Sequence, residues 1–512
     1  MTDIISNNNR IAKNTILLYV RMLVIMAVTL YTSRVVLNVL SIEDFGIYNV
    51  VGGVVTMLSF FNSSLTTSTQ RFLNYEMANS DAKSLRTVFS NAEIAHAIIA
   101  IISAIMIEVI GLWLLYNKLE IPSEQFNAAL WVFHFSVLSF FITVISSPYN
   151  AAIIAHERMN VYAYFSIIEV LLKLFSVYLL NIIPYNKLIV YGALNLLICI
   201  IVRVVYNFYC CKNFTECRGT YILNTRILKQ LFGFSGWMIF GCISDTLSKQ
   251  GVNILINIFF GPALNASRAI AIQVQSAVNM FVTNFMTAVK PQIIKKYAAG
   301  QYESMYKLVF SSSKMSYYLL LILSVPVLLY TKDILTLWLV NVPEQCIIFT
   351  RLVMVELLIT TAYTPIAQVN QASGKIKTYQ IAIAVIYILK FAFTYGAYKI
   401  GLPAYYTFVV SIMMSIIGLF VRVFILKIES QFPAKEYLIR IMLPLIPTTG
   451  IICVLQYILK HTSSEESIIA ILPNILIGAI ASCIIIYFVG LNIQERNFIK
   501  SNIKLAYNKF KK

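Results

Sequence analysis

Four basic side chains lie inside long apolar stretches of this chain, where a cation can bind an anionic group. They are Arg34, Lys173, Lys249 and Lys390. A charged side chain in hydrocarbon costs roughly 2.5 kcal/mol or more on insertion scales, so such residues usually face a bundle interior or a water-filled cavity. The four residues therefore predict a cationic cavity that binds an anion.

Acidic residues accompany two of these four cations. Glu169 precedes Lys173 by four positions, and Asp245 precedes Lys249 by four. This is the favourable helical order for a salt bridge, so a purely structural pair is the alternative to a binding role. The other two cations have no acid three or four positions away in their own run, which makes them better candidates for contact with a ligand anion.

Further charged residues lie in the apolar runs with less certain roles. Arg21 and Arg268 each lie about two helical turns from an end of their run and are added to the basic candidates. Glu108 and Glu356 are buried acids that could form charge pairs or a proton or sodium site. Snorkelling to the interface explains equally well the basic residues nearer the ends of runs, Arg203, Lys314, Arg351 and Arg422.

The sequence contains no motif for metal, cofactor or catalytic chemistry. Three cysteines cluster at Cys210, Cys211 and Cys217, but no histidine is near and their spacing fits no standard zinc pattern. The chain also lacks a P-loop, an H-E-x-x-H motif and a nucleophile elbow. We therefore expect no cofactor, no metal and no enzymatic activity.

The apolar runs themselves predict an all-α polytopic membrane protein. The chain has 512 residues, of which 59% are hydrophobic and 12% charged, against about 25% charged in soluble domains. Its apolar residues cluster in runs of about 20, the length of a membrane span. Fourteen spans are predicted near residues 13–40, 45–70, 87–116, 126–148, 160–182, 188–210, 230–257, 262–288, 308–330, 346–370, 378–398, 404–426, 437–459 and 468–491.

The charge of the loops predicts the orientation of these spans. With a cytoplasmic N-terminus, the inward connections and the tail hold twenty-five lysines and arginines and the outward connections hold five. The positive-inside rule thus supports fourteen spans with both ends in the cytoplasm. The same rule explains the net charge of +18 by anionic lipid, so no nucleic-acid partner is expected.

An internal repeat relates the two halves of the chain. At an offset of 215, residues 33–46 lie over 248–261, and at an offset of 217, residues 148–178 lie over 365–395. The matches include rare Pro, Gly, Asn, Tyr and Lys, which chance similarity of apolar helices does not explain. The offset covers six spans, an even number, so the halves share orientation about an axis along the membrane normal.

The repeat predicts the limits of the domains and aligns the four basic residues in two pairs. The expected division is an N-lobe of six spans (1–222), a C-lobe of six (223–430), and two extra helices with a basic cytoplasmic tail (431–512). In the repeat Arg34 lies over Lys249, and Lys173 lies over Lys390. Pseudo-twofold lobes would place these four cations around a central space.

Two predicted spans are unusually polar for membrane helices. Residues 60–72 read FFNSSLTTSTQRF, and the span at 262–288 carries several Asn, Gln, Ser and Thr residues. Such side chains can join helices by hydrogen bonds or line a hydrated passage and bind sugar hydroxyls. Their density favours the passage.

Three segments resemble bacterial polysaccharide-unit flippases, the O-antigen and capsule transporters of the multidrug/oligosaccharidyl-lipid/polysaccharide (MOP) exporter superfamily. They are NTILLYVRMLVIMAVTLYTSRVVLNVLSIEDFGIYNVVGGVV (14–55), TQRFLNYEMAN (69–79) and NASRAIAIQVQSAVNMFVTNFMTAVKPQIIKKYAAG (265–300). The resemblance implies alternating access that moves an undecaprenyl-diphosphate-linked oligosaccharide from the cytoplasmic to the periplasmic leaflet of the bacterial inner membrane, for O-antigen, lipopolysaccharide or capsule synthesis. It implies no individual binding residue.

The resemblance also implies partners and leaves two alternatives. The expected partners are the lipid-linked oligosaccharide, membrane lipids, and polysaccharide polymerase and chain-length machinery. A drug or cation antiporter of the same superfamily would favour acids over bases in its cavity and usually has twelve spans. A membrane polysaccharide polymerase or ligase typically carries a long periplasmic loop, and no connection here is long enough for one.

Overall fold

The computed structural model describes most of the chain as helices. The described residues are 2–40, 42–56, 58–79, 82–117, 121–180, 182–219, 222–339, 342–462, 468–493 and 495–496. These ranges contain helices and connections but no strand. Hydrocarbon offers no hydrogen-bond partners to the backbone, so apolar runs fold as helices that satisfy their own amides. The all-α prediction is confirmed for this part of the chain.

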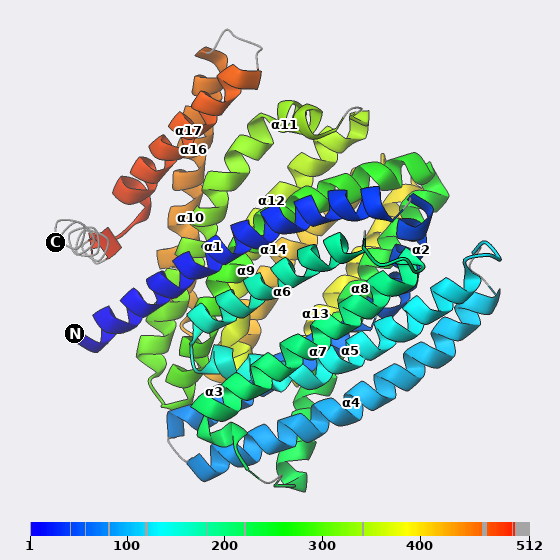
Figure 1. Cartoon of the computed structure of the whole chain (residues 1–512). Coiled ribbons are helices and arrows are strands. Elements are labelled where there is room, and N and C mark those ends of the chain that lie inside the picture. The colour runs from blue at the N-terminus through cyan, green and yellow to red at the C-terminus, as the bar shows by residue number, and fades with distance from the viewer. Residues whose placement is uncertain are drawn as a thin grey trace, which may run out of the picture. The chain divides into compact units, whose positions relative to one another are not determined.

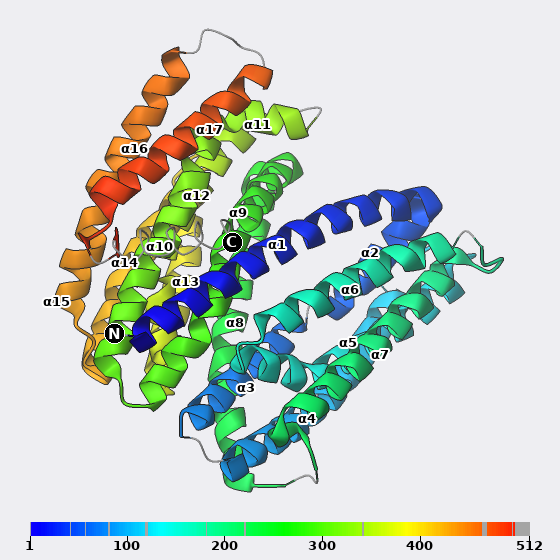
Figure 2. The ribbon, with the colours of Figure 1, turned by 60° about the vertical axis from the view of Figure 1, so that its left-hand side comes forward.

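The helices form two compact units, and the first covers residues 14–242 and 298–300. We call it the N-terminal unit. It contains most of α1 (Thr2–Val39), the first half of α8 (Thr225–Phe260), and α2 (Ile42–Thr56), α3 (Ser59–Asn79), α4 (Ala82–Asn117), α5 (Phe126–Ala155), α6 (Met159–Leu179), α7 (Lys187–Asn213) and the 3₁₀-helix η1 (Thr215–Cys217). Helix α5 packs against α4 and α7, and the three run side by side in Figures 1 and 2.

The second unit, which we call the C-terminal unit, covers residues 1–13, 243–297 and 301–512. Its elements are the rest of α8 with α9 (Pro262–Ala298), α10 (Tyr302–Leu329), α11 (Thr331–Trp338), α12 (Glu344–Ser373), α13 (Lys377–Lys399), α14 (Tyr406–Ser430), α15 (Ala434–Tyr437), the π-helical turn η2 (Leu438–Met442), α16 (Leu443–Thr462), α17 (Ile468–Ile485) and the π-helical turn η3 (Ile486–Gly490). Helices α16 and α17 pack against each other and against α10 (Figure 2).

The same packing order recurs inside each unit. Helix α5 lies between α4 and α7, and α12 lies between α10 and α14 in the same way. Helix α6 packs on α7, as α13 packs on α14. Of these helices, α5 and α6 carry the segment 148–178, and α12 and α13 carry the segment 365–395 that the sequence repeat aligns with it. The predicted domain limits at 222 and 430 stay a prediction.

Eleven helices of the described part are long and apolar enough to cross a membrane, with mean hydropathy of 1.3 to 2.6 over their most apolar stretch. The chain is therefore a multi-pass membrane protein. Helices α3 and α9 are not among the eleven because they carry more polar side chains, although each overlaps a predicted span. Helix α1 contributes a shorter apolar stretch, Asn14–Thr29, which overlaps the first predicted span. The total of fourteen spans and the inward orientation of both ends stay predictions.

One predicted span is wrong in its continuity. The run at 45–70 was expected to form one helix, and the structure divides it into α2, which ends at Thr56, and α3, which begins at Ser59. Gly52 and Gly53 lie one turn before the break, and glycine weakens a helix by about 1 kcal/mol relative to alanine. The sequence at 43–44, expected as a connection, falls in the first turn of α2.

Glycine also ends two helices that carry candidate residues. Gly261 follows the last residue of α8 with a φ of 84°, which lies in the left-handed region, and Pro262 opens α9. Gly374 follows the last residue of α12 with a φ of 77°. Glycine adopts this conformation without the clash of a Cβ atom, and proline fits the first position of a helix. These turns fix where α8, α9 and α12 begin and end.

Candidate functional site

An ion pair between two helices of the C-terminal unit holds Lys390. Its Nζ atom in α13 lies 3.4 Å from Oε1 of Glu356 in α12, and the two side chains are 20% and 15% exposed. The sequence prediction searched for an acid only within the same helix, so it missed this partner. Lys390 and Glu356, predicted separately as an anion contact and an acid site, belong to one pair.

A second cation lies near the same carboxylate. Arg268 in α9 is 8% exposed and donates a hydrogen bond to the side-chain oxygen of Asn253 in α8. The negative charge of Glu356 also attracts Arg268. Glu356 thus contacts one cation, Lys390, and interacts electrostatically with a second, Arg268. Asn253 lies within the repeat segment 248–261, but the sequence did not predict it as an arginine partner.

Lys249 lies on α8, four residues before Asn253. Its Nζ atom is 2.6 Å from Oδ2 of Asp245, and the two side chains are 61% and 32% exposed. The next residue back, Ser248, donates a hydrogen bond of 3.2 Å to the carbonyl of Tyr387 and so joins α8 to α13. The ion pair between Lys249 and Asp245 that the sequence spacing predicts is therefore present, and it is exposed.

In the N-terminal unit, Lys173 and Glu169 form a second ion pair between residues four positions apart, on α6. Their Nζ and Oε1 atoms are 2.6 Å apart, and the side chains are 41% and 34% exposed. Arg21 in α1 donates a hydrogen bond of 3.3 Å to the hydroxyl of Tyr162, and its guanidinium lies 4.3 Å from the centre of that ring. The partner of Arg21 is thus a neutral aromatic ring.

Arg34, the cation that the repeat pairs with Lys249, belongs to α1. Its side chain lies outside the described residues. Its proposed place in a cationic cavity stays a prediction.

Glu108 contacts a histidine on the neighbouring helix of the N-terminal unit. Nδ1 of His134 in α5 lies 3.0 Å from Oε1 of Glu108 in α4, and the side chains are 38% and 33% exposed. The two residues are 26 positions apart, so only the packing of α4 on α5 reveals the pair.

Two of the basic residues near span ends contact tyrosine rings. Arg422 is 9% exposed, donates a hydrogen bond of 3.0 Å to the hydroxyl of Tyr379, and lies 4.4 Å from the ring centre of Tyr363. Arg203 lies 4.3 Å from the ring centre of Tyr149. Cation–π contact lets a buried guanidinium keep an electrostatic partner without reaching water.

A third basic residue near a span end, Lys314 of α10, is also buried. It forms an ion pair of 2.8 Å with Glu495, a residue after α17. No signal in the sequence connects these two residues, because they are 181 positions apart.

The two polar spans behave differently. In α3, Ser64 donates to the thiol of Cys242 and Ser68 to the carbonyl of Leu231, at 3.5 Å each, and Asn62 accepts from Ser147 of α5 at 2.7 Å. These α3 side chains therefore join helices. Helix α9 also joins a neighbouring helix, because Asn265 donates a hydrogen bond of 3.0 Å to the carbonyl of Asn253 in α8. In addition it exposes Gln273, Ser276 and Thr283, which share one face with Met280 by their spacing.

The three clustered cysteines make local hydrogen bonds. The thiol of Cys211 lies 3.2 Å from the carbonyl of Cys217. A hydrogen bond with Cys210 and burial raise the pKa of the Cys217 thiol. Within the described residues, no group of three His, Cys, Asp or Glu side chains is placed to hold a metal ion.

We therefore expect Cys217 to react slowly with iodoacetamide at pH 7.5, because the thiolate is the nucleophile and a raised pKa lowers its population. A cysteine placed at the exposed position 301 (Gln301→Cys) is the control, and it should react at least about tenfold faster. Raising the pH to 9.5 should increase the reaction rate of Cys217 by a larger factor than that of the control cysteine. Peptide mass spectrometry measures both rates, and equal rates at pH 7.5 would contradict the expectation.

Comparison with known proteins shows which solved structures share this fold. No family model matches the chain, and no curated protein matches it in sequence. A MATE structure in the straight conformation matches with a TM-score of 0.71 and 13% identity, over 83% of this chain and 97% of that one. An outward-facing multidrug resistance MATE family transporter of the MOP superfamily matches with a TM-score of 0.69 and 13% identity, over 81% and 94%.

A third match is a MOP superfamily transporter from Pyrococcus furiosus Vc1, described as having a binding pocket of reverse polarity. Its TM-score is 0.68 at 13% identity, over 84% of this chain and 96% of that one. At such identity these matches establish the fold alone. The chain is a multi-pass membrane protein with the fold of MATE transporters.

Proposed function

We propose that this protein is a transporter of the MOP superfamily and that it moves lipid-linked oligosaccharide across the membrane. The substrate class would be undecaprenyl-diphosphate-linked repeat units, carried from the cytoplasmic to the periplasmic leaflet. The shared fold supports transport, and the sequence resemblance to polysaccharide-unit flippases supports this substrate. The setting would be the bacterial inner membrane and the synthesis of O-antigen, lipopolysaccharide or capsule.

The observation that carries this proposal is the excess of positive charge within the spans. Ten basic residues lie in the predicted spans away from the loops, against five acidic ones. Each of the five acids already contacts a partner: three contact lysines, one contacts His134, and Glu93 accepts a hydrogen bond of 2.5 Å from Tyr149.

Among the described residues, three of the arginines donate hydrogen bonds to neutral groups, and of these only Arg268 also interacts with a carboxylate, that of Glu356. Arg21 and Arg422 contact tyrosines, and Arg268 donates to an asparagine. Charge-assisted hydrogen bonds from guanidinium and ammonium groups are the strong ligands of phosphate. An excess of cations in the spans is therefore suited to a diphosphate, and the exposed polar face of α9 is suited to a glycan.

Deletion of the gene tests this proposal in the host cell. We expect lipid-linked repeat units to accumulate on the cytoplasmic leaflet and surface polysaccharide to disappear, because the units no longer reach the periplasmic polymerase and chain-length machinery. Restoring the gene on a plasmid should reverse both changes. Normal surface polysaccharide in the deletion strain would rule the substrate out.

A drug or cation antiporter is the second candidate. The observation that favours it is the match to MATE structures, one described as a multidrug resistance transporter. The Glu108–His134 pair places an acid beside an imidazole within the predicted spans. Cationic drugs at subinhibitory concentration separate the candidates: an antiporter lowers their accumulation in cells that express it, whereas the flippase leaves accumulation unchanged and restores surface polysaccharide.

A further inference from the structure

A short, rigid bend joins α14 to α15 at the predicted cytoplasmic end of the C-terminal unit. Helix α14 ends at Ser430, and the φ of 50° at the next residue, Gln431, turns the chain. The next residue, Phe432, is 2% exposed and packs edge-on against Phe310 at 5.8 Å between ring centres. The hydroxyl of Tyr306 donates a hydrogen bond of 2.6 Å to the carbonyl of Ser430. The bend is therefore anchored to the core on its inner side.

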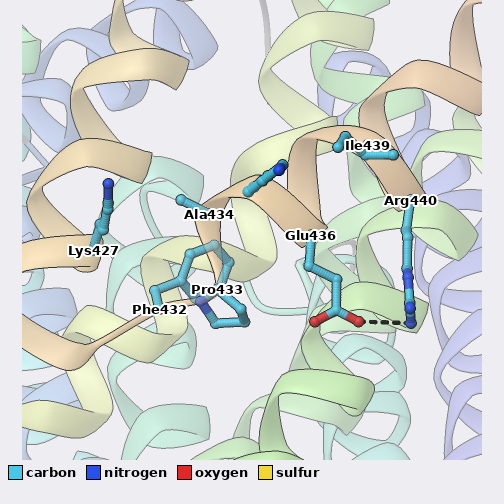
Figure 3. A pocket seen from close by; sticks show the side chains of 8 residues that line it. Lys427, Phe432, Pro433, Ala434, Glu436, Ile439 and Arg440 are labelled. Carbon is cyan, nitrogen blue, oxygen red and sulfur yellow. Dashed lines mark ion pairs between the residues drawn. The ribbon is translucent and has the colours of Figure 1, made fainter.

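The outer side of this bend forms a hollow of about 530 Å³. Figure 3 shows Lys427 on one side of it, Pro433 and Ala434 at the bend, and Glu436 with Arg440 on the other side. Lys435 lines the same hollow. Because the bend is anchored by aromatic packing, the hollow is shaped before any ligand arrives.

The hollow carries an excess of positive charge. Arg440 contacts Glu436 at 2.7 Å, and these two side chains are 72% and 42% exposed. Lys427 and Lys435 are exposed and form no ion pair within the described ranges. Two lysines therefore remain to bind an anion, beside an arginine whose guanidinium has further donors.

Apolar side chains extend from the hollow along both helices. On α14, Phe424 and Ile428 are 63% and 65% exposed, and on the other side Ile439 and Leu443 are 51% and 60% exposed. Ile439 and Arg440 lie on the π-helical turn η2, a local widening of the helix that is frequent at functional sites. The cationic hollow thus opens between two exposed apolar surfaces.

We propose that this hollow binds the phosphate of an anionic phospholipid from the cytoplasmic leaflet, with its acyl chains against the apolar surfaces of α14 and α16. Basic pockets beside membrane helices on the cytoplasmic side bind anionic head groups in this way. The apolar surfaces distinguish a lipid from free phosphate, which has no chains to place there. The site is independent of the transported substrate, so it stands or falls separately from the proposed function.

Native mass spectrometry of the purified full chain in detergent tests the proposal. The probes are phosphatidylglycerol, phosphatidylcholine with the same chains, and inorganic phosphate. The test variant is Lys427→Gln/Lys435→Gln. The matched control is Lys307→Gln/Lys375→Gln, which removes the same charge from exposed residues of the same predicted face. All four lysines are exposed, and a melting curve checks that each variant is folded.

We expect the wild type to prefer phosphatidylglycerol over phosphatidylcholine. Each lysine should contribute about fivefold, so the test variant should lose affinity about 25-fold, while the control stays within about twofold. Lys427→Arg/Lys435→Arg should keep binding because it keeps the charge, and Ile439→Gln should weaken lipid binding.

Three outcomes would overturn the proposal. They are equal losses in the test and control variants, equal binding of the two lipids, and displacement of phosphatidylglycerol by an equal concentration of inorganic phosphate. The first would indicate general surface charge, the second would indicate no recognition of the head-group charge, and the third would indicate a phosphate-only site.

Discussion

Lys390→Ala is expected to lower the flux of lipid-linked repeat units at least about thirtyfold, whereas Lys390→Arg should retain part of it. If the ammonium group binds a diphosphate, removing it deletes a charge-assisted contact, and loss of one partner from such a contact costs about 2–5 kcal/mol. Arginine keeps the charge but places it differently. The measurement is surface polysaccharide in the deletion strain complemented by each variant.

The contact with Glu356 makes a second variant necessary. Lys390→Ala leaves that carboxylate without its partner at 3.4 Å, and breaking a buried pair by removing one charge destabilises a protein by about 3–5 kcal/mol. A loss of flux alone would therefore not separate binding from folding.

The double variant Lys390→Met/Glu356→Gln separates the two explanations. It removes both charges, so the melting temperature in detergent should return close to that of the wild type. Flux should stay low, because the cation is still missing. Full flux in the double variant would mean that the pair is only structural, and Lys390 would then leave the binding site.

Most of the helices could be predicted because apolar runs and their length decide them locally. Each predicted span overlaps a helix of the structure, and the main disagreement is the break after Thr56. That break depends on weak local terms, since Gly52 and Gly53 lower helix stability without changing the apolar pattern. A run of hydrophobic residues indicates a segment buried in lipid, but it does not indicate whether that segment forms one helix or two.

The candidate site could be predicted only where partners share a helix. Lys173 and Lys249 have acids four positions earlier, and helical geometry alone brings each pair together. Lys390 and Glu356 are 34 positions apart, and their contact exists only because α12 and α13 pack with these faces together. The tyrosine partners of Arg21 and Arg422 are hidden for a further reason, because an aromatic residue in a membrane span looks like ordinary apolar packing.

The pair of Lys314 and Glu495 shows the same limit and has a measurable consequence. The lysine is 4% exposed, and its Nζ atom lies 2.8 Å from Oε2 of the glutamate. That oxygen also accepts a hydrogen bond of 2.8 Å from the backbone amide of Asn492. The residues after η3 are thus attached to α10 by a buried charge pair.

We expect Lys314→Met to lower the free energy of unfolding by about 3–5 kcal/mol, since it leaves a carboxylate buried without its cation. Lys314→Met/Glu495→Gln should recover most of that loss, because neither charge then remains. The control is Lys307→Met on the same helix: Lys307 contacts Glu303 at the shorter distance of 2.6 Å, but the side chains are 74% and 85% exposed. Water already solvates that pair, so no measurable change is expected there. Thermal melting in detergent compares the variants. If Lys314→Met and Lys307→Met shift the midpoint equally, burial is not what gives the Lys314 pair its strength.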